Sequence, residues 1–332
     1  MNSFGRIFRV HIFGESHGES VGIVIDGCPA GLPLSADDFL PDLERRKGGK
    51  QKGTTPRQEA DYPFYKSGLF NGKTTGAPIT IFFENANTRS SDYEKQRSFP
   101  RPGHADWVAH QKYGGNEDYR GGGHFSARLT TGLVAAGAIA KKIMGSGISI
   151  ISEVTEIGGE SDLEKGLQKA IDAKDSIGGL VECRVNGLPA GLGEPFFDSV
   201  ESQIAHIAFA IPAVKGVEFG SGFAAAKMFG SQHNDAIENM EGKTRTNHAG
   251  GIVGGISNGN ELVFRIAIKP TASTPKEQNS LNWDTGQTEN FSIKGRHDLC
   301  VALRAPVILE AATAIALVDL FLLEQHSKRV IR

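Results

Sequence analysis

Runs of apolar residues between glycine-containing turns predict several short β-strands along the chain. Two of them, residues 6–13 and 21–26, are rich in β-branched and aromatic residues and flank a glycine-bounded turn at residues 14–18. This arrangement favours a hairpin-like start to the fold. Further strands are predicted at residues 79–83, 180–186 and 261–269.

Helical periodicity is clearest at residues 127–144, where apolar side chains recur along one stripe of a predicted helix. Another helix is predicted at residues 202–209. Two further helix starts are indicated where a serine is followed three residues later by an acidic residue, the pattern of a capping box. These pairs are Ser35 with Asp38, before residues 39–46, and Ser161 with Glu164, before a helix that ends near Ala173.

The longest apolar run covers residues 306–323 and contains two acidic residues, Glu310 and Asp319. Because charges are costly inside a bilayer, the run predicts a buried helix rather than a membrane span. Residues 88–123, in contrast, are polar, aromatic and glycine-rich with little periodicity. A stretch of this length without regular structure is usually functional, and its arginines and histidines agree with that interpretation.

The strands and helices do not alternate in regular βαβ units, so the pattern disfavours a doubly wound nucleotide-binding sheet and favours a layered α+β fold. The length of 332 residues allows one large domain or two ordinary ones. Since no linker separates two parts of the chain, we expect a single domain spanning residues 1–332.

Composition narrows the class of protein. Thirty-six basic residues nearly balance 38 acidic ones, for a net charge of −2, so no general attraction to nucleic acid or to an anionic membrane is expected. The three cysteines form no CxxC pair, which disfavours a disulfide framework or a structural zinc site. No secretory signal is visible at the start of the sequence. We therefore expect a cytoplasmic protein.

Two familiar phosphate-binding motifs are not matched. Residues 68–74 resemble a P-loop, but only three residues separate the glycines where four are needed, and a strand follows instead of a helix. The glycine clusters at residues 121–123 and 250–255 do not fit GxGxxG after a first strand.

Histidines and arginines in glycine-rich loops are the candidate functional residues. His17 and His104 lie beside glycines, and loop histidines titrate near neutrality, so they can serve as acids or bases, although either could simply be exposed. His104, Asp106 and His110 also allow a weak metal-binding hypothesis. Arginine binds phosphate and carboxylate groups well. The arginines in such segments are Arg45, Arg46, Arg101, Arg128 and Arg296, the first two opening a basic loop at residues 45–52.

Eight short segments in order make the chain resemble the chorismate synthase family, over residues 9 to 319. They are residues 13–18 (FGESHG), 101–106 (RPGHAD), 119–123 (YRGGG), 189–195 (PAGLGEP), 214–218 (VKGVE), 247–251 (NHAGG), 269–271 (KPT) and 295–298 (GRHD). The resemblance implies a β-α-β sandwich, with helices packed between antiparallel sheets, that assembles as a homotetramer.

The resemblance also implies a reaction. Members of this family are lyases of the shikimate pathway that convert 5-enolpyruvylshikimate-3-phosphate to chorismate by an anti 1,4-elimination, in which the C3 phosphate and a C6 proton are lost. The reaction is redox-neutral but needs reduced FMN, which carries the difficult electronic step. Some fungal relatives reduce their flavin with NADPH. Because no NADPH fingerprint is visible here, we expect reduced flavin to come from elsewhere.

Roles follow from the resemblance residue by residue. His104 is expected to face the departing phosphate as a cationic acid, His17 to protonate or hydrogen-bond the flavin, and Asp298 to help move the C6 proton near the flavin. Arg46, Arg101 and Arg128, with Arg45 as a helper, are expected to bind the substrate's phosphate and carboxylates. The implied FMN-binding residues are His124, Phe125, Ser126, Pro212, Ala213, Gly254, Lys269, Pro270, Thr271, Ala272, Ser273 and Arg296.

Two of these positions depart from the family pattern. Many relatives have Arg-Ser-Ser or Arg-Ala-Ser where this chain has residues 124–126, and Asn-Ala where it has Pro212 and Ala213. A fixed cation is thus replaced by the titratable His124, so FMN binding is expected to weaken as the pH rises.

Two alternatives from other classes stay open at this point. A metal-dependent phosphohydrolase would use His104, Asp106 and His110 as ligands and would lose activity with a chelator. A non-catalytic anion-binding protein would use the basic loop at residues 45–52 and bind phosphate-bearing ligands without converting them.

Overall fold

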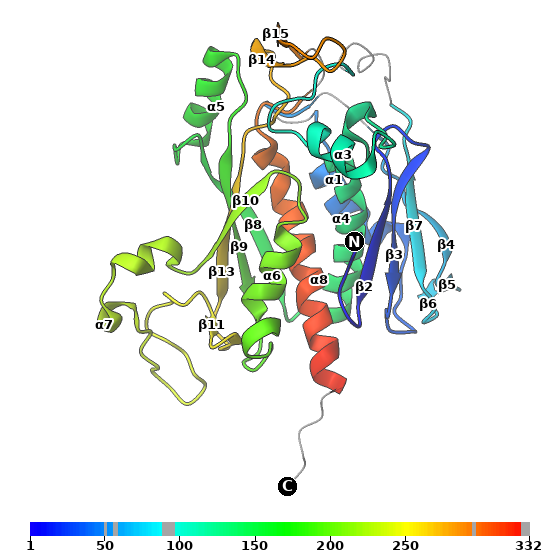
Figure 1. Ribbon diagram of the computed structural model, residues 1–332. Coiled ribbons are helices and arrows are strands. Elements are labelled where there is room, and N and C mark those ends of the chain that lie inside the picture. The colour runs from blue at the N-terminus through cyan, green and yellow to red at the C-terminus, as the bar shows by residue number, and fades with distance from the viewer. Residues whose placement is uncertain (50–51, 56–58, 88–96, 294–296, 327–332) are drawn as a thin grey trace.

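Two antiparallel sheets enclose a layer of helices in the computed structural model, which describes residues 1–49, 52–55, 59–87, 97–293 and 297–326. Figure 1 shows one sheet on each side of the long helices, with the α6 helix at the edge of the same layer. The α+β class and the β-α-β sandwich predicted from the sequence are confirmed.

The first sheet has the strand order β1-β2-β3-β7-β4, and every neighbouring pair is antiparallel. Side chains alternate along its central strands, so that Val21, Ile23 and Ile25 are fully buried against the helices. The strands are β1 (Ser3–Phe4), β2 (Arg9–Gly14), β3 (Ser20–Asp26), β4 (Phe64–Ser67) and β7 (Ile79–Glu84).

The second sheet has the order β10-β13-β9-β8 and is also antiparallel. Strand β13 shows the same alternation, with Leu262, Phe264 and Ile266 buried. The strands are β8 (Ser149–Ile157), β9 (Gly179–Asn186), β10 (Val214–Phe219) and β13 (Leu262–Ile268).

The helical layer is centred on α4 (Thr130–Met144) and α8 (Ala305–His326), flanked by α1 (Leu40–Arg46) and α6 (Val200–Ala208). The two central helices approach closely, because a Cβ atom placed on Gly137 of α4 would lie 2.3 Å from the Cβ of Ala311 in α8. Residues 301–325 are long and apolar enough to cross a membrane by composition alone, yet 83% of their most apolar window is buried inside the fold. The segment is therefore the core helix that the sequence predicted.

The two acidic residues within this helix both have partners in the fold. Asp319 Oδ1 accepts hydrogen bonds of 2.7–3.0 Å from the backbone N–H groups of residues 6–8, which ties the start of the first sheet to α8. Glu310, which is 2% exposed, pairs with Arg45 at 2.7 Å and with Lys141 at 3.1 Å. Both acids are thus part of the core architecture.

Smaller elements lie around this sandwich, several of them at its top in Figure 1. The helices are α3 (Asp106–Tyr113), α5 (Leu163–Ala173) and α7 (Gly230–His233). The strands are β5 (Leu69–Phe70), β6 (Lys73–Thr74), β11 (Ile252–Val253), β12 (Ile256–Ser257), β14 (Gln278–Leu281) and β15 (Thr288–Phe291). Single 3-10 turns are η1 (Ala36–Asp38), η2 (Arg120–Phe125), η3 (Ala127–Leu129), η4 (Phe196–Asp198), η5 (Gly222–Lys227) and η6 (Val301–Arg304).

Three local differences from the sequence prediction have physical causes. The capping box predicted at Ser161 is wrong, because Asp162 is the N-cap of α5 and its carboxylate accepts the N–H of Lys165 at 3.1 Å. The helix predicted from residue 127 begins as a 3-10 turn, which Ser126 caps by accepting the N–H of Arg128. The irregular stretch also contains α3, which buries only Ala109 and so leaves no apolar periodicity to detect.

Candidate active site

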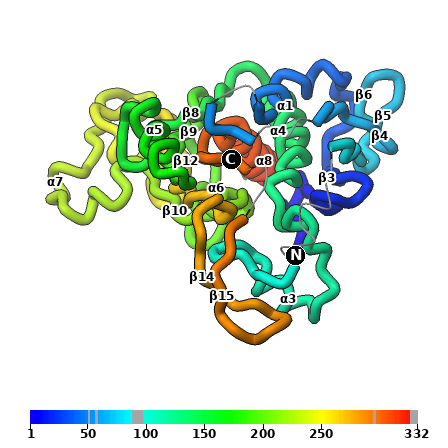
Figure 2. The backbone as a smooth tube through the Cα atoms, turned by 90° about the horizontal axis from the view of Figure 1, so that it is seen from above, coloured from blue at the N-terminus to red at the C-terminus, as the bar shows by residue number. Residues whose placement is uncertain are grey.

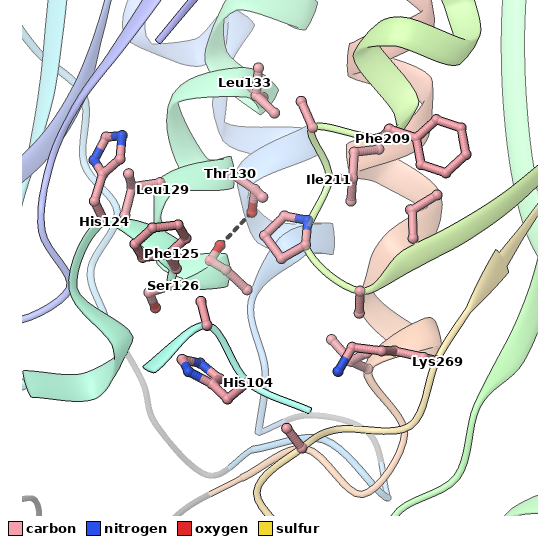
Figure 3. A pocket seen from close by; sticks show the side chains of 18 of the residues that line it. His104, His124, Phe125, Ser126, Leu129, Thr130, Leu133, Phe209, Ile211 and Lys269 are labelled. Atoms are coloured by element: carbon pink, nitrogen blue, oxygen red, sulfur yellow. Dashed lines mark hydrogen bonds between the residues drawn. The ribbon is translucent and has the colours of Figure 1, made fainter. Parts of the chain in front are cut away.

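A cavity of about 700 Å³ lies near the top of the sandwich between its two halves, and Figure 3 shows it from close by. We call it the main cavity. Its walls come from segments far apart in sequence. Figure 2, a view from above, shows α4 and α8 between the strands of the two sheets. The walls include residues 103–105, 124–127, 206–207, 209–215, 269–273 and 297–298, together with Arg101, Gly121 and residues 1–4.

A second cavity of about 160 Å³, the arginine cavity, is lined by Arg46, Arg128 and Arg304. It shares several wall residues with the main cavity, so the two spaces are adjacent. The shared residues are Gly121, Ser126, Ala127, Thr271, His297 and Asp298. Together, the two cavities offer one elongated site with a strongly cationic end.

Buried charge is concentrated at that end. Arg46 and Arg128 are 3% and 6% exposed, and both pair with the single carboxylate of Asp61, Arg46 at 3.5 Å. Burial lowers the pKa of Arg46 to about 9, with a further contribution from the positive charge of Arg304. Two buried guanidinium groups on one carboxylate leave positive charge uncompensated, which favours an anionic ligand.

Helix α1 and the start of α4 fix the Arg46 side chain. Its Nε donates to Thr130 Oγ1 at 3.0 Å and its Nη2 donates to the carbonyl of Ala127 at 2.8 Å. Arg304, the last residue of η6 before α8, donates from Nε to the carbonyl of Arg46 at 3.1 Å. These contacts hold the cationic groups in place before any ligand arrives.

His104 belongs to a hydrogen-bonded group at the loop that precedes α3. Its Nδ1 lies 2.6 Å from Asp106 Oδ1, so the ring donates there and leaves Nε2 free of the carboxylate. Arg101 also donates to Asp106, from Nε at 2.7 Å and from Nη2 at 2.8 Å. These hydrogen bonds hold the pKa of Asp106 well below its usual range despite the burial that opposes it. The carboxylate therefore stays charged and orients both cations.

Two consecutive glycines bring His17 and His104 together. A Cβ on Gly121 would lie 2.2 Å from His17 Cε1, and a Cβ on Gly122 would lie 3.1 Å from His104 Cε1. Both glycines have positive φ angles, of 61° and 86°, which also disfavour other residues there. His17 is 9% exposed and lines neither cavity, whereas the neighbouring Gly121 lines both.

Asp298 lies where the two cavities meet. Its carboxylate accepts the N–H of Thr55 at 2.8 Å and a hydrogen bond from Arg304 Nη1 at 3.1 Å. Next to it, His297 has its pKa lowered to about 4 by burial and by the nearby positive charge of Arg101. Within the described part of the chain, the buried Nε2 of His297 has no hydrogen-bond partner. A neutral imidazole and a fixed carboxylate thus face the same space.

Most of the residues predicted for FMN line the main cavity. They are His124, Phe125, Ser126, Pro212, Ala213 and residues 269–273. The ring of His124 donates from Nδ1 to the carbonyl of Gly14 at 2.8 Å, so only Nε2 can act on a ligand.

Three predicted residues among the described part of the chain line neither cavity: His17, Arg45 and Gly254. Arg45 pairs with Glu310 and Asp42 instead, which gives no support to the prediction that it helps to bind substrate. Gly254 lies in the turn between β11 and β12, outside both cavities. Arg296 lies outside the described residues, as does part of the basic loop at residues 45–52.

Sequence reasoning missed Asp61, Arg304 and His297, and considered Asp106 only as a metal ligand. Some signals were present. Arg304 is an isolated cation directly before the long apolar run, and His297 stands next to the predicted catalytic Asp298. Asp61 carried no local signal, because its importance comes from two arginines that are distant in sequence.

The metal-binding alternative is not supported by this geometry. The guanidinium of Arg101 occupies the carboxylate that would have held a cation. His110 Nδ1 lies 3.2 Å from Glu117 Oε1, and the His110 ring lies tilted against the Trp283 ring, with their centroids 4.8 Å apart. No group of three or more His, Cys, Asp or Glu side chains among the described residues is arranged to hold a metal ion.

Comparison with known proteins identifies relatives along the whole chain. The family model described as chorismate synthase matches residues 8–322. The chain is 70% identical to a chorismate synthase of Chitinophaga pinensis over 332 residues, which is all of both chains. It is 45% identical to a chorismate synthase of Dehalococcoides mccartyi, covering 100% of this chain and 99% of the relative. A crystal structure of chorismate synthase matches with a TM-score of 0.74 and 28% identity, covering 97% of this chain and 93% of the other.

Proposed function

The chain belongs to the chorismate synthase family, and we propose that the main cavity and the arginine cavity together form its active site. Its activity is the elimination that converts 5-enolpyruvylshikimate-3-phosphate to chorismate, a carbon–oxygen lyase step in aromatic amino-acid biosynthesis. The observation that carries the assignment of the site is the convergence of His104, Asp298 and the paired arginines on one connected space.

The family uses reduced FMN, and the residues present fit that group. The main cavity offers about 700 Å³ and a mixed apolar and polar wall. That wall includes His297, whose buried Nε2 has no hydrogen-bond partner among the described residues. Residues 124–126, 212–213 and 269–273 would hold the flavin. When bound, reduced flavin supplies electron density to the reacting substrate, which no side chain here can provide.

The protein's part at the leaving group falls to His104 and Arg101. A phosphate that departs from C3 develops negative charge, and pre-positioned cations stabilise such charge most effectively in a water-poor site. Asp106 keeps the Nδ1 proton of His104 in place, so Nε2 can present a second proton to a phosphate oxygen. His17 lies one glycine away and would hydrogen-bond the flavin through the gap beside Gly121.

The carboxylates of the substrate are assigned to the arginine cavity. Arg46 and Arg128 share Asp61 and therefore retain net positive charge for an incoming anion. Guanidinium groups bind carboxylates through paired, directional hydrogen bonds, so they fix the orientation of the substrate ring as well as its position. Asp298, at the junction of the cavities, is then the carboxylate that helps to move the C6 proton.

The histidine assignments are tested by His104→Ala and His17→Ala in an anaerobic assay with dithionite-reduced FMN that follows chorismate absorbance. Each variant should lower turnover roughly 10- to 10⁴-fold, the usual range for a positioned acid or base. His110→Ala is the matched control, because this histidine lies on α3 and contacts Glu117 and Trp283 instead of the cavities. Near-normal turnover in both test variants, with circular dichroism unchanged, would remove these residues from the mechanism.

We also propose that the single domain acts as a homotetramer. Buried residues of both sheets and of the helices belong to one hydrophobic core, which supports a single domain. Several large apolar side chains remain exposed at the edges of this unit, among them Phe196 (88%), Phe197 (91%) and Phe223 (80%). Analytical ultracentrifugation should give about four times the chain mass, and a monomer at micromolar concentration would contradict the proposal.

A cytoplasmic location and an external source of reduced flavin complete the proposal. Within the family of soluble metabolic enzymes, the cytoplasm fits three cysteines that are all free and buried. Burial raises the pKa of the Cys183 thiol to about 12, so this thiol is inert to oxidation. NADPH oxidation by the purified protein with FMN would contradict the external source.

A further inference from the structure

Asn85 follows the last residue of β7 and contacts the turn that carries His17. Its backbone N–H donates to the carbonyl of Glu19 at 3.1 Å, which extends the pairing of β7 with β3 by one residue. Its side-chain Nδ2 donates to the carbonyl of Glu15 at 3.0 Å and to the carbonyl of Gly18 at 2.9 Å. One amide group therefore holds the turn on both sides of His17.

The guanidinium of Arg128 fixes which way this amide points. Its Nε donates to Asn85 Oδ1 at 3.0 Å, and its Nη2 donates to the carbonyl of Glu84 at 3.2 Å. Guanidinium nitrogens can only donate and carbonyl oxygens can only accept, so the amide oxygen must face Arg128 and the amide nitrogen must face the turn. Since Arg128 is only 6% exposed, this anchor for the amide is itself well buried.

The turn is also attached to the glycine-rich segment η2. The N–H of Gly18 donates to the carbonyl of Glu15 at 3.2 Å and closes the turn, while the N–H of Ser16 donates to the carbonyl of Gly123 at 3.0 Å. The Asn85 amide joins the same turn to the first sheet and to the wall of the arginine cavity. Removing this amide would thus let the turn shift while the sheet stays intact.

Resting on the role proposed for His17 toward the flavin, we propose that Asn85 is a positioning residue for His17. Asn85 lines neither cavity, so it acts through the turn and not through a ligand. Arg128 orients the amide, and the amide holds the two carbonyls that flank His17. A misplacement of about 1 Å in an active site can lower turnover about 100-fold, even when its cause lies away from the reacting atoms.

Two substitutions test the amide in the anaerobic chorismate assay. Asn85→Ala should lower turnover about 10- to 100-fold and change KM by less than about threefold, because Arg128 keeps its contacts with Asp61 and the carbonyl of Glu84. Asn85→Asp keeps an acceptor for Arg128 but turns an oxygen toward two carbonyl oxygens. Its turnover should fall at least as far as that of Asn85→Ala.

Asn116→Asp is the matched control. The Nδ2 of Asn116 also donates to two main-chain carbonyls, those of Tyr113 at 3.0 Å and Gly114 at 3.3 Å. These contacts lie at the end of α3, and Asn116 lines neither the main cavity nor the arginine cavity. Turnover of Asn116→Asp should stay within about twofold of wild type, since the substitution removes the same kind of hydrogen bonds away from His17.

A double-mutant cycle with His17→Ala separates positioning from general damage to the fold. If Asn85 acts through His17, adding Asn85→Ala to His17→Ala should lower turnover no further, within about threefold. Losses that multiply would instead show that the two residues act independently, and they would overturn the proposal. Circular dichroism on each variant confirms that the comparison is made on folded protein.

Two further results would also overturn the positioning role. Wild-type turnover in Asn85→Asp would show that donation to the turn does not matter. A raised KM with unchanged turnover in Asn85→Ala would assign Asn85 to substrate binding through Arg128. A His17→Ala variant with normal turnover is a different failure, because it refutes the role of His17 in the proposed function and leaves Asn85 nothing to position.

Discussion

Replacing Asp106 by Asn tests whether one carboxylate organises the leaving-group end of the site. The substitution keeps the shape of the side chain but removes the charge that accepts hydrogen bonds from Arg101 and His104. Arg101 is 8% exposed, so its guanidinium would be left buried without a charged partner. Breaking one partner of a buried ion pair costs about 3 kcal/mol, and we expect the free energy of unfolding to fall by this amount.

Asp106→Asn should lower turnover by more than the loss of folded protein alone would explain. An amide does not stabilise the protonated ring of His104 and can itself donate to Nδ1, which would turn the ring to the unproductive tautomer. We therefore expect turnover of Asp106→Asn to fall about 10²- to 10⁴-fold at saturating substrate, with a much smaller change in KM.

Two measurements on the same preparations separate these effects. Urea unfolding gives the change in stability, and the anaerobic chorismate assay gives turnover under conditions where the variant is fully folded. Asp198→Asn is the control, because Asp198 pairs with the 57% exposed side chain of Arg6 outside the cavities, and it should cost less than about 1 kcal/mol. Turnover of Asp106→Asn within threefold of wild type would refute the reasoning, since the carboxylate would then have no part in orienting His104.

Four further outcomes are expected. Asp319→Ala should lower the free energy of unfolding by about 3 kcal/mol, because the backbone N–H groups of residues 6–8 lose their acceptor. Urea denaturation measures this change, and a value below about 1 kcal/mol would contradict the expectation. Because the pKa of His297 is lowered to about 4 in the folded protein, the unfolded chain binds more protons than the folded one below about pH 6.5. The free energy of unfolding should therefore fall between about pH 6.5 and 4. In denaturation curves, His297→Gln should reduce this dependence of the free energy of unfolding on pH. His124→Arg, which places a fixed cation in the wall of the main cavity, should tighten FMN binding, and an unchanged dissociation constant would show that this position does not contact the cofactor. Turnover should be indifferent to EDTA, and its loss on chelation, restored by a divalent metal, would revive the phosphohydrolase alternative.

The sequence by itself determined the fold class, the main helices and five strands of the two sheets, because periodicity is a local signal; β1, β4, β8 and β10 were not predicted. The apolar stripe of residues 127–144 and the alternation along residues 261–269 each mark one apolar face. Such a face must be buried, whichever helix or strand packs against it. The segment α3 escaped prediction for the same reason, since a helix that buries only Ala109 leaves no such pattern. Candidate catalytic residues were found through short segments shared with a known family.

What only the tertiary structure decided is which charges meet. Arg46, Arg128 and Asp61 come from three separate segments, and their mutual burial is created by packing rather than by any spacing in the sequence. Long-range electrostatics depends on distance and on exclusion of water, and both are properties of the folded chain.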